Sequence, residues 1–407
     1  MNIDVDLSNP DTFVDGIPFP AFQRLRTEAP LYWQPETNGR GFWCVTRYDD
    51  LMAVSKDPLT FSSARGGTNI FEVSEEDMSM LRLLMLNMDP PKHNKFRRLV
   101  STGFTARMVT QLEPHVRGIC RTLIDNVMEH ESFDFVTAIA AELPLLVIAE
   151  LLGVPAEDRH KVFEWSNSLV GFDDPEYATS METGKMASAQ MWAYANQLAN
   201  ERKEHPLGDL VSVLMQAEVD GDRLSEMEFD SFFLLLAVAG NETTRNLISG
   251  GMRALIEHPE ERARLVADPS LLPTGIEELL RWVSPLIHFR RTATRDVQMH
   301  GHTIKEGDKV VIFYPSANRD ERKFVNPETF DVTRAPNEHL AFGIGEHFCL
   351  GANLARLEIK LIFEEMLRRL PDLEFDGPVR RLRSNFINGI KAMPVRRTSA
   401  APQRREA

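Results

Sequence analysis

The sequence is poor in cysteine, in positive charge and in long apolar runs. Its 407 residues contain three cysteines, Cys44, Cys120 and Cys349, and no Cys-x-x-Cys pair. So few cysteines, in odd number, exclude a disulfide framework or a zinc finger and are typical of a reducing compartment. Cys44 and Cys120 lie in apolar stretches, so we predict that both are packing residues.

Positive charge is scarce relative to negative charge. The chain has 46 lysines and arginines against 60 aspartates and glutamates, which gives a formal net charge of −14. A chain this acidic is unsuited to general binding of nucleic acid, whose phosphates attract basic surfaces. We therefore expect no nucleic-acid partner.

Long apolar runs are missing as well. The longest, about residues 232–239, is much shorter than the ~18–20 residues of a membrane-spanning helix. The N-terminus is polar and acidic, without the basic and apolar regions of a secretory signal. These absences predict a cytoplasmic protein without a membrane anchor. Apolar residues still make up 43% of the chain, and no Pro/Gly/Ser-rich linker divides it. We expect one domain over 1–397 and a disordered tail over 398–407.

The most specific pattern that is present surrounds Cys349. The decapeptide FGIGEHFCLG, residues 342–351, holds three glycines and precedes an amphipathic run that predicts a helix over 352–370. Glycine permits positive φ and close backbone approach, so this stretch predicts a tight bend against a flat object. A cysteine near a helix N-terminus favours a thiolate, which is a possible ligand for haem iron. The alternative is a small buried thiol without a ligand role.

Two other helices carry polar residues in distinctive patterns. A helix that begins near Pro90 places His93 and Arg97 four residues apart on one face, a pair suited to an anion or to solvent. Residues 227–258 lack proline and predict a helix roughly 45 Å long. Its middle reads AGNETT, residues 239–244. Small residues there let a large group press against the helix, and a threonine hydroxyl can distort it; an ordinary glycine defect is the alternative.

The remaining pattern is mostly helical. Apolar spacing near 3.6 predicts helices over 48–56, 113–129, 138–152, 157–169 and 183–203. Aromatic and β-branched residues predict a hairpin over 31–46, short strands at 287–294, 297–304 and 310–314, and a final hairpin over 385–395 that turns at Asn388 and Gly389. Residues 61–87 fit either a lid over an apolar pocket or a surface helix.

Together these patterns resemble the cytochrome P450 superfamily of haem-thiolate monooxygenases. The decapeptide matches the family's haem-binding loop, AGNETT its oxygen-activation motif, and Glu278-x-x-Arg281 its buried Glu-x-x-Arg motif. The resemblance covers about residues 89–394, in the family's order. It implies a mainly α, triangular fold with a minor β region, and haem b between the long central helix and the helix after the bend, with the Cys349 thiolate as axial ligand.

The resemblance also implies roles for other residues. Glu242 and Thr243 match the acid–alcohol pair that delivers protons, although the family often has Asp where this chain has Glu242. Glu278 and Arg281 are implied to lock, with Arg334, the loop that leads to the cysteine. The residues implied to contact haem are His93, Arg97, Ala239, Gly240, Arg291, Phe342, Gly343, His347 and Gly351. Arg290 is an alternative to Arg291 as the partner of a haem propionate.

The substrate and the electron donor are less closely specified. We expect a monomeric enzyme for a hydrophobic small molecule: a terpenoid, a steroid side chain or a branched fatty acid. Candidate pocket residues, nearly all apolar, are Ile70, Phe71, Leu84, Ala237, Leu286, Ile287 and Ile387. A ferredoxin with its reductase is the expected donor, because no flavin or nicotinamide domain is fused here. A basic patch suits such an acidic partner; its residues are Lys92, Lys95, Arg98, Arg356 and Lys360.

Two other functional classes stay open. One is a haem-thiolate enzyme that uses peroxide directly or rearranges its substrate without O₂, and such an enzyme can dispense with a proton relay. The other is a non-catalytic haem- or ligand-binding protein, in which the Glu242–Thr243 pair would have no purpose. The intact pair therefore favours a monooxygenase over both.

Overall fold

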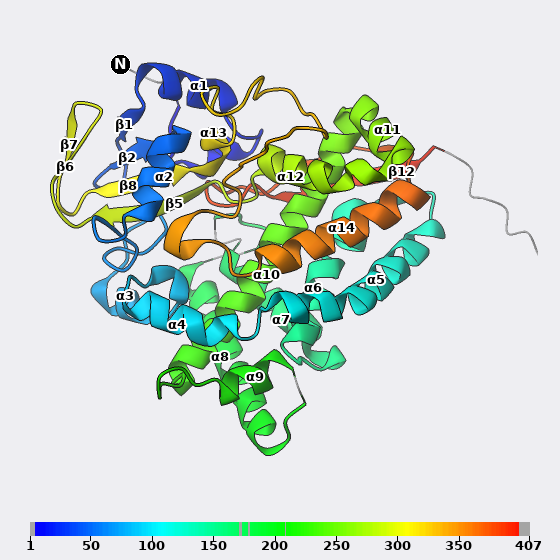
Figure 1. Cartoon of the computed structure of the whole chain (residues 1–407), viewed down its shortest axis with the longest axis horizontal. Coiled ribbons are helices and arrows are strands. Elements are labelled where there is room, and N and C mark those ends of the chain that lie inside the picture. The colour runs from blue at the N-terminus through cyan, green and yellow to red at the C-terminus, as the bar shows by residue number, and fades with distance from the viewer. Residues whose placement is uncertain (1–4, 171–172, 178–179, 208, 399–407) are drawn as a thin grey trace, which may run out of the picture.

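The computed structural model describes residues 5–170, 173–177, 180–207 and 209–398. Helices fill most of the molecule, and the strands of the largest sheet lie together at one corner (Figure 1). This is the mainly α fold with a minor β region that the sequence predicts. Apart from Thr398, the predicted tail lies outside the described residues.

The elements have the following bounds. The α-helices are α1 (Phe19–Glu28), α2 (Tyr48–Lys56), α3 (Glu75–Leu81), α4 (Lys92–Ser101), α5 (Ala106–Met128), α6 (Glu142–Leu151), α7 (Arg159–Val170), α8 (Met181–Glu204), α9 (Leu210–Gln216), α10 (Glu226–Glu257), α11 (Pro259–Ala267), α12 (Leu272–Val283), α13 (Tyr314–Ala317) and α14 (Ala352–Arg369). The strands are β1 (Leu31–Gln34), β2 (Phe42–Val45), β3 (Phe61–Ser62), β4 (Ser132–Asp134), β5 (His288–Ala293), β6 (Val297–Met299), β7 (His302–Ile304), β8 (Lys309–Phe313), β9 (Leu373–Phe375), β10 (Arg380–Arg381), β11 (Ile390–Ala392) and β12 (Pro394–Arg397).

Helix α10 runs through the helical part of the molecule and packs against α6, α7, α8 and α12. Its start is fixed by a capping box: Ser225 Oγ accepts a hydrogen bond from the N–H of Glu228, whose carboxylate accepts one from the N–H of Ser225 at 3.1 Å. These bonds satisfy N–H groups that a helix start otherwise leaves unpaired. The helix ends two residues before Pro259. The predicted span 227–258 is confirmed to within one residue at each end.

The largest sheet has the strand order β1-β2-β8-β5-β3. β1 and β2 form the antiparallel hairpin predicted over 31–46, with Leu31 opposite Val45. β8 pairs in parallel with β2 and antiparallel with β5, where Arg291 lies opposite Val310. Successive side chains of a strand point to opposite faces, so Arg290 and Arg291 face opposite sides of this sheet.

The end of the chain differs from the prediction. In place of one hairpin over 385–395, β11 pairs with β10, and β12 lies between β4 and β9. Local turn residues cannot specify a long-range partner such as β4. Helix α5 starts seven residues before the predicted residue 113, because Pro114 lies inside the helix. The short helices α9 and α11, of 7 and 9 residues, had too few turns for their periodicity to predict.

The segment 61–87 contains a short helix within a longer loop. Helix α3 is capped by Ser74, whose Oγ accepts from the N–H of Asp77 at 3.0 Å. Its Met78 is buried, and Asp77 forms an ion pair of 3.0 Å with Lys185 of α8. The predicted surface helix therefore describes the middle of this segment.

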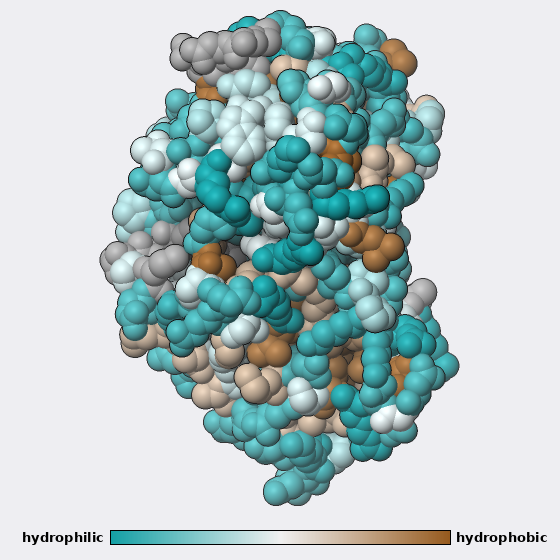
Figure 2. Space-filling view, turned by 90° about the vertical axis from the view of Figure 1, so that its left-hand side faces the viewer, coloured by the Kyte–Doolittle hydropathy of each residue, from teal (hydrophilic) through white to brown (hydrophobic). Residues whose placement is uncertain are grey.

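The large apolar core joins α4–α12 to α14 and β12, and two smaller clusters lie on the two faces of the main sheet. No helix among the described residues is long and apolar enough to cross a membrane. The face on the left of Figure 1 is mainly hydrophilic, with apolar atoms in small groups (Figure 2).

Candidate active site

The bend over residues 342–351 closes on itself directly before α14. The N–H of Cys349 donates to the carbonyl of Phe342 at 2.9 Å. Gly343 and Gly345 have φ of +69° and +77°, a left-handed conformation that glycine adopts without steric cost. A Cβ on Gly345 would lie 2.6 Å from the carbonyl oxygen of Ser55, so the end of α2 packs directly on the bend. Gly351, by contrast, has φ of −87° and no close neighbour.

Of the three cysteines, Cys44 and Cys120 are fully buried, which confirms them as packing residues, whereas Cys349 is partly accessible. Burial raises the pKa of the Cys349 thiol, against the opposing effects of the Gly351 N–H, Arg97 and Arg356. The sequence predicted a thiolate from the helix N-terminus, and desolvation outweighs that effect in the chain alone. A bound metal cation would reverse the balance, because the ligating form of cysteine is the thiolate.

Helix α4 directs His93 and Arg97 toward the bend. The ring centroid of His93 lies 4.2 Å from that of His347. His93 is fully buried, and among the described residues its Nε2 has no hydrogen-bond partner. Burial lowers the pKa of both histidines, and for His347 the charges of Arg291 and Arg97 help to bring it to about 2. Both rings are therefore neutral at neutral pH. Nδ1 of His93 lies 3.3 Å from Oδ1 of Asn94, an acceptor, so the single N–H of the ring is on Nδ1 and Nε2 is an unpaired ring nitrogen.

Arg290 and Arg291, which the sequence could not distinguish, point to opposite faces of strand β5. Arg290 faces Glu72, with 3.4 Å between Nη1 and Oε2. Arg291 is 3% exposed and has no carboxylate within ion-pair distance in the described part of the chain. Its Nη1 donates to the carbonyl of Arg290 at 2.9 Å, and its charge acts on His347. A buried guanidinium without a carboxylate is costly, so Arg291 fits a site for an anion.

The middle of α10 has an accessible stripe, although the stretches of the helix on either side of it are mostly buried. Ala239 is exposed, and Gly240 and Thr243 are half-buried. Thr243 Oγ1 donates to the carbonyl of Ala239 at 2.8 Å, the helix-distorting bond that the sequence predicts. Accessible small side chains halfway along a helix that four other helices surround indicate a hollow beside it.

Glu242 lies away from that stripe. Its Oε1 is 3.0 Å from Nη1 of Arg245, and both side chains are only 4% exposed. The same Nη1 is 3.2 Å from Oδ1 of Asn167 on α7. Adjacent helical residues do not face each other, and among the described contacts no hydrogen bond joins Glu242 to Thr243. The sequence analysis did not predict a role for Arg245, although its i, i+3 spacing from Glu242 is typical of an ion pair on a helix.

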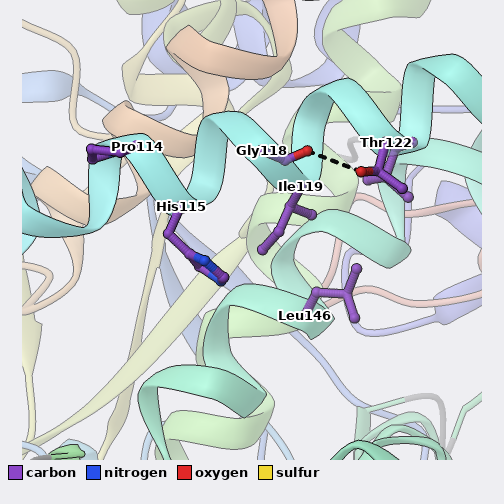
Figure 3. Close-up of a pocket in the computed structure, with 7 residues that line it drawn as sticks. Pro114, His115, Gly118, Ile119, Thr122 and Leu146 are labelled. Atoms are coloured by element: carbon purple, nitrogen blue, oxygen red, sulfur yellow. Dashed lines mark hydrogen bonds between the residues drawn. The ribbon is translucent and has the colours of Figure 1, made fainter.

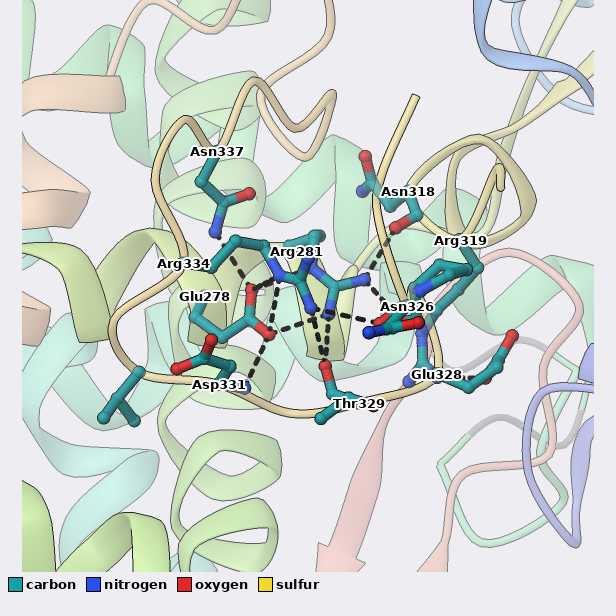
Figure 4. A network of polar contacts seen from close by, with 12 residues as sticks. Glu278, Arg281, Asn318, Arg319, Asn326, Glu328, Thr329, Asp331, Arg334 and Asn337 are labelled. Carbon is teal, nitrogen blue, oxygen red and sulfur yellow. Dashed lines mark hydrogen bonds and ion pairs between the residues drawn. The ribbon is translucent and has the colours of Figure 1, made fainter. Parts of the chain in front are cut away.

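Glu278, Arg281 and Arg334 meet at one buried carboxylate (Figure 4). Arg281 donates to both oxygens of Glu278, at 2.7 and 2.8 Å, and both side chains are fully buried. Nε of Arg334 lies 3.1 Å from the same carboxylate. Arg281 also donates to carbonyls of Asn318, Pro327 and Thr329. The network ties α12 to the long loop that leads into the cysteine bend.

Glu277 is a site residue that the sequence prediction missed. It accepts hydrogen bonds from Arg356 at 2.7 and 2.8 Å and lies 3.0 Å from Nε2 of His339. Although burial raises the pKa of Glu277, these two partners lower it to about 2. Arg356 in turn lies 4.5 Å from the ring centroid of Phe342. The successive residues Glu277 and Glu278 of α12 therefore make separate contacts with the region around the bend. The pair of adjacent glutamates was the feature of the sequence that could have predicted this.

The residues predicted to line a substrate pocket fall into separate groups. Ile70 and Ile287 belong to an apolar cluster on one face of the sheet, whereas Leu84 and Ala237 are part of the helical core. Leu286 and Ile387 are joined by an isolated β-bridge. Phe71 is 37% exposed.

A groove of about 350 Å³ lies elsewhere, between α5 and α6 (Figure 3). Its lining residues are Pro114, His115, Gly118, Ile119, Thr122, Leu123 and Leu146. None of them is a predicted site residue, and nothing in the structure shows what covers this groove.

Every basic residue of the predicted patch has a carboxylate partner. The pairs are Lys92 with Glu228 at 3.6 Å, Lys95 with Asp222, Arg98 with Asp220 at 3.1 Å, Arg356 with Glu277 at 2.7 Å and Lys360 with Glu364 at 3.7 Å. The expected excess of positive charge is therefore compensated by neighbouring acids.

The donor set around the bend suits one kind of group. Cys349 offers a soft ligand to a metal, His93 an unpaired ring nitrogen and Arg291 a cation without a carboxylate partner. Glycine-rich backbone and the small residues of α10 leave room for a flat body. A planar macrocycle with anionic substituents and a thiolate-binding metal meets all of these features, which define the class of haem-thiolate proteins.

Comparison with known proteins identifies the family. The cytochrome P450 family model matches residues 145–377. The steroid C26-monooxygenase of Rhodococcus jostii is 43% identical, covering 96% of this chain and 84% of the relative. The methyl-branched lipid omega-hydroxylase of Mycobacterium tuberculosis is 42% identical over 96% of this chain and 94% of its own.

Solved structures agree. A Mycobacterium marinum cytochrome P450 in complex with pseudoionone superimposes with a TM-score of 0.90, at 39% identity and with 97% of this chain and 98% of that one covered. A Bacillus megaterium cytochrome P450 in complex with corticosterone gives a TM-score of 0.83 at 34% identity, with 94% and 98% covered. The chain belongs to the cytochrome P450 family. It is accordingly a monooxygenase that uses haem b with a cysteine thiolate as axial ligand.

Proposed function

We propose that this enzyme hydroxylates the branched alkyl end of a hydrophobic molecule, of the steroid side-chain or methyl-branched lipid class, with O₂ and electrons from a ferredoxin. Two relatives above 40% identity support the substrate class, since their names place oxidation at C26 of a steroid and at the omega end of a methyl-branched lipid. The observation that carries the reaction type is the partly accessible Cys349 in a glycine bend, beside the unpaired Nε2 of His93 and the buried Arg291, which has no carboxylate partner among the described residues.

Four side chains would hold the haem. Cys349 is the proposed axial ligand, while His93, with its proton moved to the unpaired Nε2, and the guanidinium groups of Arg97 and Arg291 would bind the propionates. Because Arg290 already has Glu72 as partner, Arg291 is the stronger candidate of the two neighbours. When bound, haem b supplies the oxygen chemistry, and the protein supplies orientation, charge and the exclusion of water.

Thr243 and Glu242 are the proposed proton-handling residues. The Thr243 hydroxyl donates a hydrogen bond to the Ala239 carbonyl, so its oxygen lone pairs can accept a hydrogen bond from a water in the hollow. The Glu242 carboxylate is held by Arg245 on the packed side of the helix. We propose that this carboxylate leaves Arg245 to pass protons from the α7 side toward Thr243, with Asn167 keeping the guanidinium in place.

The substrate would lie against the accessible stripe of α10. Leu286 and Ile387, which share a β-bridge, and Ala237 and Leu84 in the helical core are the proposed apolar contacts, with Ile70, Phe71 and Ile287 on the side of the sheet. Apolar walls give affinity and few polar constraints, which suits a long branched hydrocarbon.

The test is a titration of the haem-loaded enzyme, followed by absorbance, with three ligands: a steroid with a branched side chain, a methyl-branched fatty acid and a straight-chain fatty acid of equal carbon number. We expect a spin-state shift with the branched ligands at concentrations about tenfold lower than with the straight chain, since a pocket shaped for a branched end would leave part of a longer unbranched chain outside and unburied. Mass spectrometry of the products should place the new hydroxyl on the terminal branch. Equal response to the straight chain, or oxidation of a ring carbon, would contradict the proposal.

A further inference from the structure

A tight acidic hairpin lies between α9 and α10, beneath α4 in Figure 1. Val219 and Asp222 each donate an N–H to the other's carbonyl at 3.0 Å. Between them, Asp220 and Gly221 have φ of +56° and +82°, the combination of a type I′ turn that Asp-Gly favours. This turn holds Asp220 and Asp222 in fixed positions.

The hairpin and the start of α10 pair with one side of α4. The cations at positions i, i+3 and i+6 of that helix each have one partner: Lys92 with Glu228, Lys95 with Asp222 and Arg98 with Asp220. The carboxylate of Glu228 is itself held by the capping box at the start of α10. Three acids in rigid backbone settings therefore meet three basic side chains that remain partly exposed.

The same helix adjoins the proposed haem site. His93 lies on another side of α4, and its ring centroid is 4.2 Å from that of His347 in the cysteine bend. An electron donor that docks near Cys349 through acidic side chains would meet Lys95 and Arg98, which Asp222 and Asp220 already occupy.

We propose that the acidic hairpin of residues 218–223 is an intramolecular competitor of the electron donor, and that an acidic ferredoxin docks by exchanging its own carboxylates for those of Asp220 and Asp222. The inference rests on the proposed function, which names a ferredoxin as donor. Exposed ion pairs are individually weak and screened by salt, so the exchange is feasible. A neutral or basic partner could not replace the carboxylates of the hairpin. The ion pairs between the hairpin and α4 would therefore favour acidic partners over others.

The experiment measures binding of a plant-type [2Fe–2S] ferredoxin to the haem-loaded enzyme by calorimetry at low ionic strength. Asp220→Asn and Asp222→Asn are made singly and together; Asn suits the same turn as Asp, so the hairpin keeps its shape. The control is Glu218→Gln. That residue belongs to the same hairpin and binds Arg223 at 2.7 Å, so its loss removes equal charge and frees no cation of α4.

We expect Kd to fall about three- to tenfold in the double variant and to change less than twofold in the control, because only the former releases cations to the partner. In a Lys95→Ala/Arg98→Ala background the effect of the hairpin substitutions should vanish. An equal increase of affinity in the control, or an increase that persists in the Lys95→Ala/Arg98→Ala background, would contradict the proposed competition. Either result would indicate a general effect of charge. Absence of ferredoxin binding by every variant would contradict the ferredoxin named in the proposed function, and would overturn the competitor with it.

Failure of the proposed function has a separate signature. The same preparations, reduced chemically and exposed to carbon monoxide, report the thiolate ligand by their absorption spectrum. A spectrum without the red-shifted Soret band of a thiolate-ligated haem would contradict the assignment of Cys349. The binding curves would still test the role of the hairpin.

Discussion

At the scale of single residues, carboxylates with two or more partners hold the loop around the cysteine. Glu278 binds Arg281 and Arg334, and its neighbour Glu277 binds Arg356 and His339. Glu278 and Arg281 are fully buried, where removal of one partner typically costs about 3–5 kcal/mol. The second set is closer to solvent and is the better place to measure an electrostatic contribution.

We predict that Glu277→Gln lowers the free energy of unfolding at pH 7 by about 1.5–3 kcal/mol, the usual contribution of hydrogen bonds to charged groups. The folded-state pKa of Glu277, about 2, lies below the ordinary 4.5. Its contribution is therefore complete above about pH 4.5 and is lost as the pH falls toward 2. Urea unfolding between pH 7 and pH 3 should show the wild type approaching the variant as the pH drops. Glu260→Gln, an exposed carboxylate of α11, is the control, and a constant gap between wild type and Glu277→Gln would contradict the ionic account.

Thr243 gives a residue-scale test of the chemistry. Its hydroxyl lies on the accessible stripe of α10, so we predict that Thr243→Ala lowers product formed per O₂ consumed by about 10-fold or more. Peroxide should rise in compensation, because oxygen reduction continues without proton delivery. Thr243→Ser keeps a hydroxyl and should stay within a few-fold of wild type. An alanine variant with unchanged coupling would favour an enzyme that uses peroxide or needs no O₂.

At the scale of elements, the bend before α14 depends on glycine at one position for two reasons. Gly345 has positive φ, and a Cβ there would lie 2.6 Å from a backbone oxygen of α2. Gly301 in the β6–β7 turn has a similar φ of +78° and open space around it. The two positions thus separate backbone strain from steric conflict.

We predict that Gly301→Ala costs about 1 kcal/mol, from positive φ alone, whereas Gly345→Ala costs about 2–4 kcal/mol because the backbone must also move. The haem content of the purified protein should fall with Gly345→Ala only. Thermal unfolding and the ratio of haem to protein absorbance measure both effects. Equal losses for the two variants would show that α2 does not constrain the bend.

The sequence predicted some elements closely and others poorly, for physical reasons. Helices α2, α10 and α14 combine strong periodicity with clear ends, and their predicted bounds agree with the structure to within one residue. The final hairpin was wrong because β11 pairs with the preceding β10, and β12 lies between β9 and β4, a strand distant in the chain. For the site, the order of motifs indicated the cysteine bend and the Glu278–Arg281 pair. Arg290 and Arg291 could be distinguished only once the structure showed which face of the sheet each side chain of β5 points to. The roles of Glu277 and Arg245 became visible only once the structure showed their ion-pair partners.

At the scale of the whole molecule, an acidic chain with net charge −14 carries its basic residues in compensated pairs around α4 and α14. Long-range attraction of an acidic donor is therefore weaker than a count of lysines and arginines on that face implies. Selectivity would come from exchange of individual ion pairs at the contact. Association with a ferredoxin should accordingly depend on the hairpin substitutions described above more than on overall charge.

The central claim is that Cys349 binds haem iron as a thiolate, and one measurement tests it most directly. The haem-loaded protein is reduced, exposed to carbon monoxide and compared with Cys349→Ala and with Cys120→Ala, which removes a buried thiol far along the chain. We predict a strongly red-shifted Soret band in the wild type and in Cys120→Ala, and its loss in Cys349→Ala. Persistence of that band without Cys349, or its absence from the well-folded, haem-loaded wild type, would contradict the ligand assignment and the roles proposed for Glu242, Thr243 and Arg291.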